Sequence, residues 1–297
     1  MRNEAPAYYI ERFDSWALTR FGDVWTACND PNVSSSRGSV AGHLLTKVQP
    51  LQRMLNVMDK PDPTRLRALA RSYFAPIRMR ELENEFRSFI TNLLDTAARD
   101  RDELDVVNDF AQPFATYIAC QVTGLPREDG DMLRDLVVRF FTREPGVDGV
   151  TESGLQALKE LDEYCMRLCA DRRRKGGGGD DTLGALLCYR ENGRPMPDEE
   201  VAQNLSLIII GGTDTVPKVF GSTLHRLFHN PDARARVVAD SDLALDAFHE
   251  TLRIDMPTQY MARCLLADTD RYGVNRTAST MTARTLSCDS FSPAMDL

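Results

Sequence analysis

Apolar residues recur at three- and four-residue steps over most of this chain, which is the pattern of amphipathic helices. The clearest stripe is formed by Leu82, Phe86, Phe89, Ile90, Leu93, Leu94 and Ala97. A second stripe, between residues 155 and 174, is formed by Leu158, Leu161, Tyr164, Cys165, Leu168 and Cys169. Both segments are predicted to be helices that place one face on a core.

Further helices are predicted from start signals and shorter apolar runs. Asp62-Pro63-Thr64 begins one helix, and Pro113 is expected to begin or bend another over residues 106–122. Met196-Pro197-Asp198 begins a long helix that continues to about His229, about 50 Å at 1.5 Å per residue. The other predicted helices cover residues 21–28, 125–141, 181–189, 231–239 and 241–254.

Few segments have the pattern of strands or loops. Residues 16–19 are predicted to be a strand, and the serine-rich residues 32–42 a long loop. The basic run at residues 172–175 is interpreted as a solvated helix end rather than a docking patch, and Gly176 to Gly179 as a flexible linker. Without repeats or alternating strands and helices, the chain is predicted to be mainly α with a small β region.

Composition narrows the function classes. The chain has 297 residues, of which 42% are hydrophobic and 27% charged, and its net charge of −8 argues against nucleic acid as a partner. The longest apolar run, residues 205–210, is far shorter than the roughly 20 residues of a membrane span. Seven cysteines without a Cys-x-x-Cys pair and an N-terminus without a secretion signal predict a cytoplasmic protein with reduced thiols.

The long predicted helix contains residues that are unfavourable for a helix interior: Gly211-Gly212-Thr213-Asp214-Thr215, followed by Pro217. Each glycine costs about 1 kcal/mol relative to alanine, and Pro217 removes the hydrogen bond to the carbonyl of Thr213. A kink or an opened turn is therefore expected. The glycines would let a flat ligand approach, with Asp214 and Thr215 as a proton-delivery pair; the alternative is close packing of two helices at the glycines.

Two other constellations are weaker alone. Glu250 and Arg253 lie on one helix face, where a surface ion pair is the ordinary explanation. His225 and His229 have the spacing of two zinc ligands, but Arg226 stands where a metalloprotease helix has glutamate. We therefore interpret the histidines as ordinary core or surface residues and predict no metal site.

In order and spacing, these motifs resemble those of the cytochrome P-450 family, the haem-thiolate monooxygenases. Residues 211–215 are similar to the family's oxygen-groove signature, and Glu250 with Arg253 is similar to its Glu-x-x-Arg signature. Residues 16–24 look like the family's first strand and following helix. The resemblance covers about residues 6–274 and implies a helical fold with a small β region, incomplete at both ends.

The resemblance implies haem as the cofactor, a small organic substrate and, if haem is bound, a ferredoxin-type redox partner. Arg67 and Arg263 fall where the family has arginines on the haem propionates, although Pro63 stands in place of a usual histidine. Asp214 and Thr215 would relay protons, Gly211 and Gly212 would border the haem, and Glu250 and Arg253 would be structural. Substrate contacts would come from residues 34–42 and from residues near Phe140.

The chain departs from the family at its ends. It begins late, without the family's first helix, and it has no Phe-x-x-Gly-x-x-x-Cys-x-Gly loop to supply the thiolate ligand. Cys288 lacks the neighbouring glycines and follows Arg253 too closely. We predict a P-450-like domain over residues 1–274 that lacks the haem-ligand part. Residues 275–297 are interpreted as a non-homologous tail, produced by a truncation or a change of reading frame.

Three functions therefore stay open. The first is a monooxygenase-related protein that is impaired because the thiolate is missing. The second is a haem-free helper that binds and activates a partner enzyme such as a glycosyltransferase, a role that has less need of the retained motifs. The third is the inert product of a damaged gene.

Overall fold

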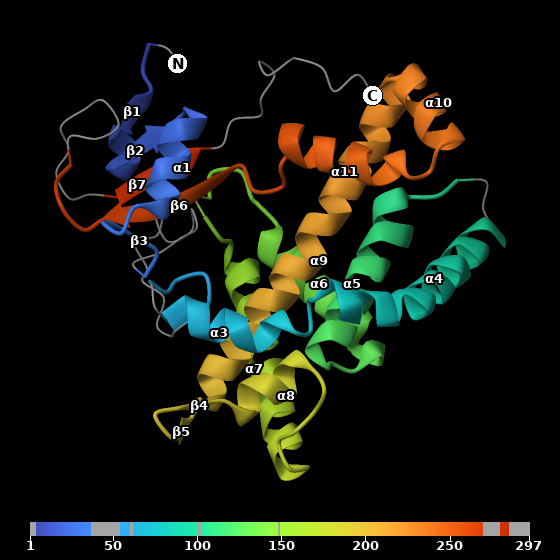
Figure 1. Ribbon diagram of the computed structural model, residues 1–297, viewed down its shortest axis with the longest axis horizontal. Coiled ribbons are helices and arrows are strands. Elements are labelled where there is room, and N and C mark those ends of the chain that lie inside the picture. Colours follow the sequence, from blue (N-terminus) through green and yellow to red (C-terminus); the bar gives the residue numbers. More distant parts are fainter. Residues whose placement is uncertain are drawn as a thin grey trace. The chain divides into compact units, whose positions relative to one another are not determined.

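Helices make up most of the structure, as predicted. The computed structural model describes residues 4–36, 54–59, 62–99, 103–147, 149–269 and 280–284 (Figure 1). Its α-helices are α1 (Phe21–Asn29), α3 (Asp62–Arg71), α4 (Pro76–Arg99), α5 (Gln112–Thr123), α6 (Gly130–Phe141), α7 (Glu152–Arg174), α8 (Thr182–Cys188), α9 (Asp198–His229), α10 (Pro231–Ala239) and α11 (Leu243–Ile254). Every predicted helix is present, with ends shifted by a few residues. Pro113 lies in the first turn of α5, which confirms the helix start expected there.

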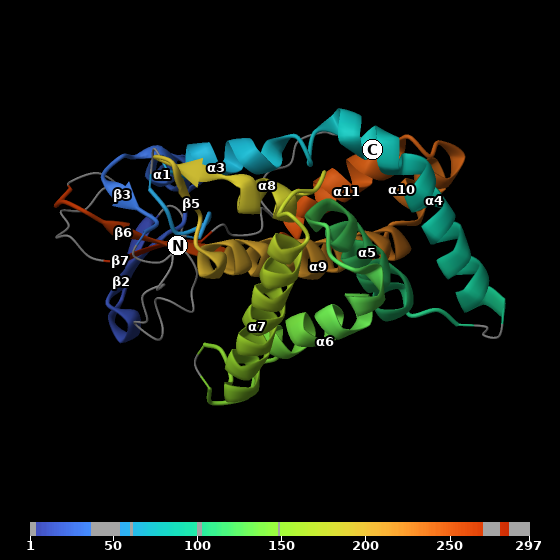
Figure 2. The same ribbon diagram turned by 90° about the horizontal axis from the view of Figure 1, so that it is seen from below.

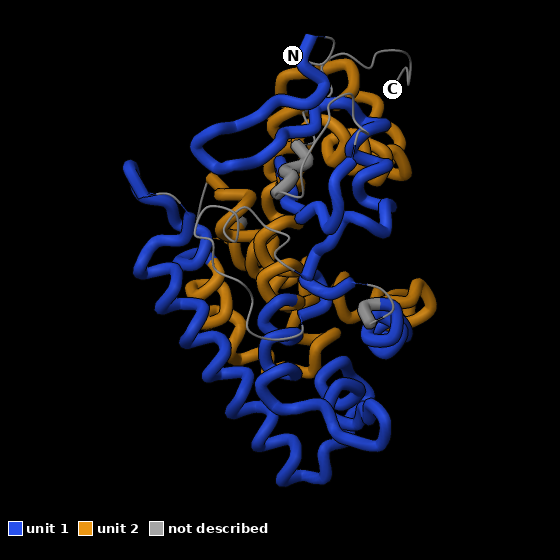
Figure 3. The backbone as a smooth tube through the Cα atoms, turned by 90° about the vertical axis from the view of Figure 1, so that its left-hand side faces the viewer, with its two compact units in different colours: residues 1–73, 138–207, 259–286 blue, residues 74–137, 208–258, 287–297 orange. Residues whose placement is uncertain are grey.

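The chain divides into two compact units (Figure 3). The first comprises residues 1–73, 138–207 and 259–286, and the second comprises residues 74–137, 208–258 and 287–297. The first unit holds the sheet with α1, α3, α7 and α8, and the second holds α4, α5, α10 and α11. Helices α6 and α9 contribute residues to both.

The first unit contains a five-stranded sheet with the order β1 (Ala7–Ile10), β2 (Ser15–Leu18), β7 (Thr280–Arg284), β6 (Tyr260–Leu265) and β3 (Val33–Ser34). The strand predicted at residues 16–19 is confirmed as β2, shifted by one residue. Strand β7 was not predicted, because residues 275–297 have no alternating pattern. It pairs in parallel with β2 and antiparallel with β6, so partners distant in sequence hold it in the sheet.

Apolar residues from the sheet and α1 form a small core in this unit. Leu18, Ala27 and Leu265 are buried there, and Val24 and Val33 pack against them. A separate hairpin of β4 (Arg190–Glu191) and β5 (Arg194–Pro195) precedes α9. Its two turn residues, Asn192 and Gly193, have φ angles of 53° and 80°, which fits the two-residue turn that joins such strands.

Helix α9 is uninterrupted from Asp198 to His229 (Figure 2), so the opened turn expected at Pro217 is wrong. Packing in the second unit explains why. The ring of Phe220 lies 5.3 Å from the ring of Phe110, in the single π-helical turn η2 (Val106–Ala111). A Cβ atom built on Gly221 would lie only 2.9 Å from Val107 Cγ2. The fit of α9 against η2 therefore outweighs the poor local propensity.

Ion pairs hold the basic end of α7 in the first unit. Arg172 Nη1 lies 2.9 Å from Asp181 Oδ2, and Arg173 donates to Asp198 Oδ1 at 2.6 Å, at the start of α9. The two arginines link the end of α7 to the starts of α8 and α9. The interpretation of this end as simply solvated is therefore incomplete. The predicted linker is also held closely, because a Cβ atom on Gly184 would lie 2.6 Å from the carbonyl oxygen of Gly179.

Candidate functional site

Of the two adjacent glycines on α9, Gly211 faces open space and Gly212 faces α5. A Cβ atom built on Gly211 meets no atom of the described residues within 4 Å, and Gly211 is exposed. A Cβ atom on Gly212 would lie 3.5 Å from Ala119 Cβ on α5, an ordinary contact distance. Close helix packing therefore does not require either glycine, and the space beside Gly211 is available to a ligand.

Asp214 and Thr215 lie next to this opening, but each side chain is already engaged. Asp214 Oδ2 accepts a hydrogen bond from Lys218 Nζ at 2.6 Å, and the side chain of Asp214 is only 15% exposed. Thr215 Oγ1 donates to the carbonyl oxygen of Gly211 at 2.7 Å. Lys218 was not among the predicted site residues, although the i,i+4 spacing of an acid and a base was a usable signal.

Two bidentate ion pairs lie around α11 in the second unit. Arg253 donates to Glu250 through Nε at 2.8 Å and Nη2 at 2.6 Å, as their spacing predicted. Arg226 on α9 donates to both carboxylate oxygens of Asp255, at 2.5 and 2.7 Å. The hydrogen bonds from Arg253 lower the pKa of Glu250, and the charge of Arg226 lowers it further. The second pair was missed because 29 residues separate its partners.

The two histidines of the zinc alternative meet edge to face on α9, with ring centroids 4.5 Å apart. Within the part of the chain that the structure describes, no group of three or more His, Cys, Asp or Glu side chains could hold a metal ion.

The two predicted propionate arginines lie in the first unit. Arg67 on α3 is exposed, and Arg263 on β6 is half-buried and donates from Nη1 to the carbonyl oxygen of Ala262 at 2.7 Å. Neither forms an ion pair with an acid among the described residues. Since a guanidinium group pairs well with a carboxylate, both arginines fit an anionic group such as a haem propionate. Pro63 lies in the first turn of α3.

The cysteines of the described residues do not fit an axial haem ligand. Burial raises the pKa of the Cys120 thiol to about 11 and the pKa of the Cys165 and Cys169 thiols to about 12, so all three stay protonated at neutral pH. Cys28 and Cys188 are exposed, and Cys264 on β6 is half-buried. Cys288 lies outside the described residues. The arginines thus fit the propionates, whereas the three buried cysteines do not fit the iron.

The predicted substrate loop is anchored at its first residues. Asp59 accepts hydrogen bonds from Ser34 Oγ at 2.5 Å and from the backbone N–H of Ser35 at 2.7 Å. Residues 37–42 lie outside the described residues. Phe140, the other candidate, packs edge-on against Phe141 at the end of α6, with ring centroids 5.0 Å apart. The anchor by Asp59 was not predicted, since 25 residues separate it from Ser34.

Comparison with known proteins identifies the family. The putative cytochrome P450 123 of Mycobacterium tuberculosis is 30% identical over 274 residues, which cover 92% of this chain and 67% of that protein. Cytochrome P450 107B1 of Saccharopolyspora erythraea is 29% identical over 260 residues, covering 84% and 62%. None of the protein-family models compared with the chain matches it.

The fold agrees with these relatives. The solved structure of a mutant of P450 EryK in complex with erythromycin B has a TM-score of 0.85 and 25% identity, and the match covers 100% of this chain and 74% of that one. The open form of EryK from S. erythraea gives a TM-score of 0.83 with 26% identity. The chain therefore belongs to the cytochrome P450 family, as its motifs predicted, and haem is the cofactor of that family. It spans about two thirds of the length of the curated relatives it matches.

No described helix is both long enough and apolar enough to cross a lipid bilayer. The cytoplasmic location stays a prediction.

Proposed function

We propose that this chain derives from a monooxygenase that inserts one oxygen atom of O2 into a small organic substrate, with electrons from a ferredoxin-type partner. In the form of these 297 residues it is impaired in that reaction. The observation that carries the proposal is the open face of α9 at Gly211, with Asp214 and Thr215 beside it. An acid and a hydroxyl next to an open backbone are what proton delivery to a bound ligand needs.

The residues of this chain have distinct roles in that proposal. Arg67 and Arg263 hold the haem propionates through charge-assisted hydrogen bonds. Bound haem supplies the iron at which oxygen is activated. The hydroxyl group of Thr215 donates its hydrogen bond to the carbonyl oxygen of Gly211 in the resting structure. When a ligand in the opening can accept a hydrogen bond, this hydroxyl turns toward the ligand and donates to it instead. Once the ion pair with Lys218 opens, the Asp214 carboxylate takes up a proton from solvent and passes it to Thr215 Oγ1, which replaces the proton that Thr215 has given away.

The two ion pairs of the second unit have a structural role. Arg226 joins α9 to Asp255 after α11, and Arg253 holds Glu250 on the same helix. The first pair links α9 to the end of α11, and the second stabilises α11 itself. In the same proposal, residues 34–42 and residues near Phe140 contact the substrate.

The impairment is proposed because no cysteine of these 297 residues lies in a Phe-x-x-Gly-x-x-x-Cys-x-Gly loop. The test is titration of the purified chain with haem, followed by reduction under carbon monoxide. We expect weak binding or none, and no thiolate-type absorption band. A strong band of that type would refute the impairment, and loss of the band in a Cys288→Ser variant would then identify the ligand.

The helper role is the second candidate. The pairs Asp214–Lys218 and Glu250–Arg253 are complete without a cofactor, so the second unit needs no haem to neutralise these charges. A colourless chain that raises the activity of a co-expressed partner enzyme would favour the helper, whereas a red chain would favour the haem protein.

The division at residue 274 and the origin of the tail stay predictions. If the reading frame changes there, the nucleotides after that codon, read in another frame, encode a Phe-x-x-Gly-x-x-x-Cys-x-Gly loop. Sequencing the gene and its downstream region decides this. The absence of such a loop in every frame would favour a haem-free role.

A further inference from the structure

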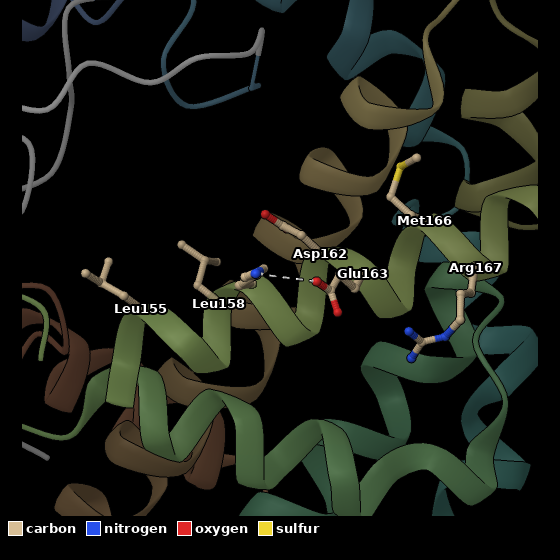
Figure 4. A pocket seen from close by; sticks show the side chains of 7 residues that line it. Leu155, Leu158, Asp162, Glu163, Met166 and Arg167 are labelled. Atoms are coloured by element: carbon tan, nitrogen blue, oxygen red, sulfur yellow. Dashed lines mark ion pairs between the residues drawn. The ribbon is translucent and has the colours of Figure 1, made fainter. Parts of the chain in front are cut away.

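A hollow of about 620 Å³ lies along one side of α7 in the first unit (Figure 4). Its apolar wall consists of Leu155, Leu158 and Met166, which follow one another at three- and eight-residue steps on one helix face. Asp162 lies in the same row, four residues from both Leu158 and Met166, and Figure 4 shows it between them. The hollow is thus an apolar strip with a single carboxyl group inside it.

A second row of the same helix forms the polar border of the hollow. It consists of Lys159, Glu163 and Arg167, each four residues from the next. Lys159 Nζ lies 4.0 Å from Glu163 Oε1 (Figure 4). Glu163 therefore has a basic residue on each side, one turn before it and one turn after it. The basic residues of this row therefore neutralise Glu163 rather than Asp162.

Asp162 is poorly compensated within the first unit. Its Oδ1 accepts one hydrogen bond, from Ser206 Oγ on α9 at 2.7 Å, and it forms no ion pair with a cation among the described residues. Burial raises the pKa of Asp162, and the hydrogen bond from Ser206 offsets only part of this effect. A half-buried carboxylate with one neutral donor is costly, and an added positive charge would stabilise it.

We propose that this hollow binds a small organic amine, whose ammonium group pairs with Asp162 and whose apolar body covers Leu155, Leu158 and Met166. The choice follows from the lining. A carboxylic acid would bring a second negative charge to Asp162, and a neutral alcohol would supply a hydrogen bond but no counter-charge. This binding needs neither haem nor oxygen, so it does not depend on the proposed function.

The test compares three ligands with the same eight-carbon chain: octylamine, 1-octanol and octanoate. Binding to the full chain is measured by isothermal titration calorimetry at pH 8, where the amine is protonated. We expect octylamine to bind at least about tenfold more tightly than 1-octanol, and octanoate to bind weakest. Equal affinities for the amine and the alcohol, or no binding of the amine, would overturn the proposal.

Variants locate the binding. Asp162→Asn keeps the shape of the side chain and an oxygen that accepts from Ser206, so it removes mainly the charge. It should lower the affinity for octylamine about tenfold and leave the affinity for 1-octanol unchanged. Glu163→Gln, one residue away in the polar row, is the matched control and should change the octylamine affinity less than twofold. Equal losses in both variants would contradict a specific role of Asp162.

A measurement on the unaltered chain covers the case in which Asp162→Asn does not fold. Octylamine affinity should fall as acid protonates Asp162, at pH values where the amine stays charged. Amide NMR shifts on adding octylamine should be concentrated in residues 155–167. Shifts elsewhere, or an affinity that does not change with pH, would refute the site. Haem titration of the same sample reports on the proposed function separately.

Discussion

Three glycines of α9 provide a direct test of how this helix packs. Gly211 has open space around it, whereas a Cβ atom on Gly221 would lie 2.9 Å from Val107 Cγ2. Replacing glycine by alanine in a helix gains about 1 kcal/mol from propensity. We expect Gly211→Ala to stabilise the fold by this amount. Gly212→Ala should behave similarly, because its nearest neighbour, Ala119 Cβ, would lie at an ordinary 3.5 Å.

Gly221→Ala should have the opposite sign. The added methyl group pushes against Val107, whose β-branched side chain has little freedom to turn away, and such overpacking costs about 1–3 kcal/mol. After the gain in propensity, we expect a net loss of about 1 kcal/mol, so the two alanine variants differ by about 2 kcal/mol. Urea unfolding followed by far-UV circular dichroism measures the difference.

A second substitution checks the cause. Val107→Ala removes the methyl group that Gly221→Ala would meet. In a chain that already carries Val107→Ala, the further change Gly221→Ala should therefore cost much less stability than it does in the unaltered chain. The reasoning fails if Gly221→Ala is as stable as Gly211→Ala, or if the two effects at positions 107 and 221 simply add.

Three further predictions concern charges and thiols. Burial raises the pKa of Asp59, but hydrogen bonds from Ser34 and the following serines lower it more. The stability that these hydrogen bonds contribute is present above the ordinary pKa of 3.8 and is lost as the pH falls through the lowered pKa. Asp59→Asn should therefore flatten the pH dependence of thermal unfolding below about pH 4. Arg226→Met should lower the free energy of unfolding by about 1 kcal/mol. In a double-mutant cycle, adding Asp255→Asn to this variant should cause little further loss, whereas losses that simply add would exclude the pair. In a thiol titration at pH 8 without denaturant, Cys28 and Cys188 should react rapidly, whereas Cys120, Cys165 and Cys169 should react only on unfolding.

The sequence by itself determined the helices and the order of the motifs. Apolar spacing predicted α4 and α7, and the start signal at Met196 predicted α9 with its correct end at His229. Helical hydrogen bonds and helix faces join residues three or four apart, so a short stretch of sequence contains the information. The pair Glu250–Arg253 was found for the same reason.

The tertiary structure alone decided which distant residues meet. The unbroken course of α9 at Pro217 depends on Val107 and Phe110, about a hundred residues earlier in the chain. The anchor of Ser34 by Asp59, the contact of Asp162 with Ser206 and the place of β7 between β2 and β6 also join distant segments. None of these contacts has a fixed spacing along the chain. They form only when folding brings the segments together, because a strand or a half-buried carboxylate is stabilised by its neighbours in space rather than in sequence.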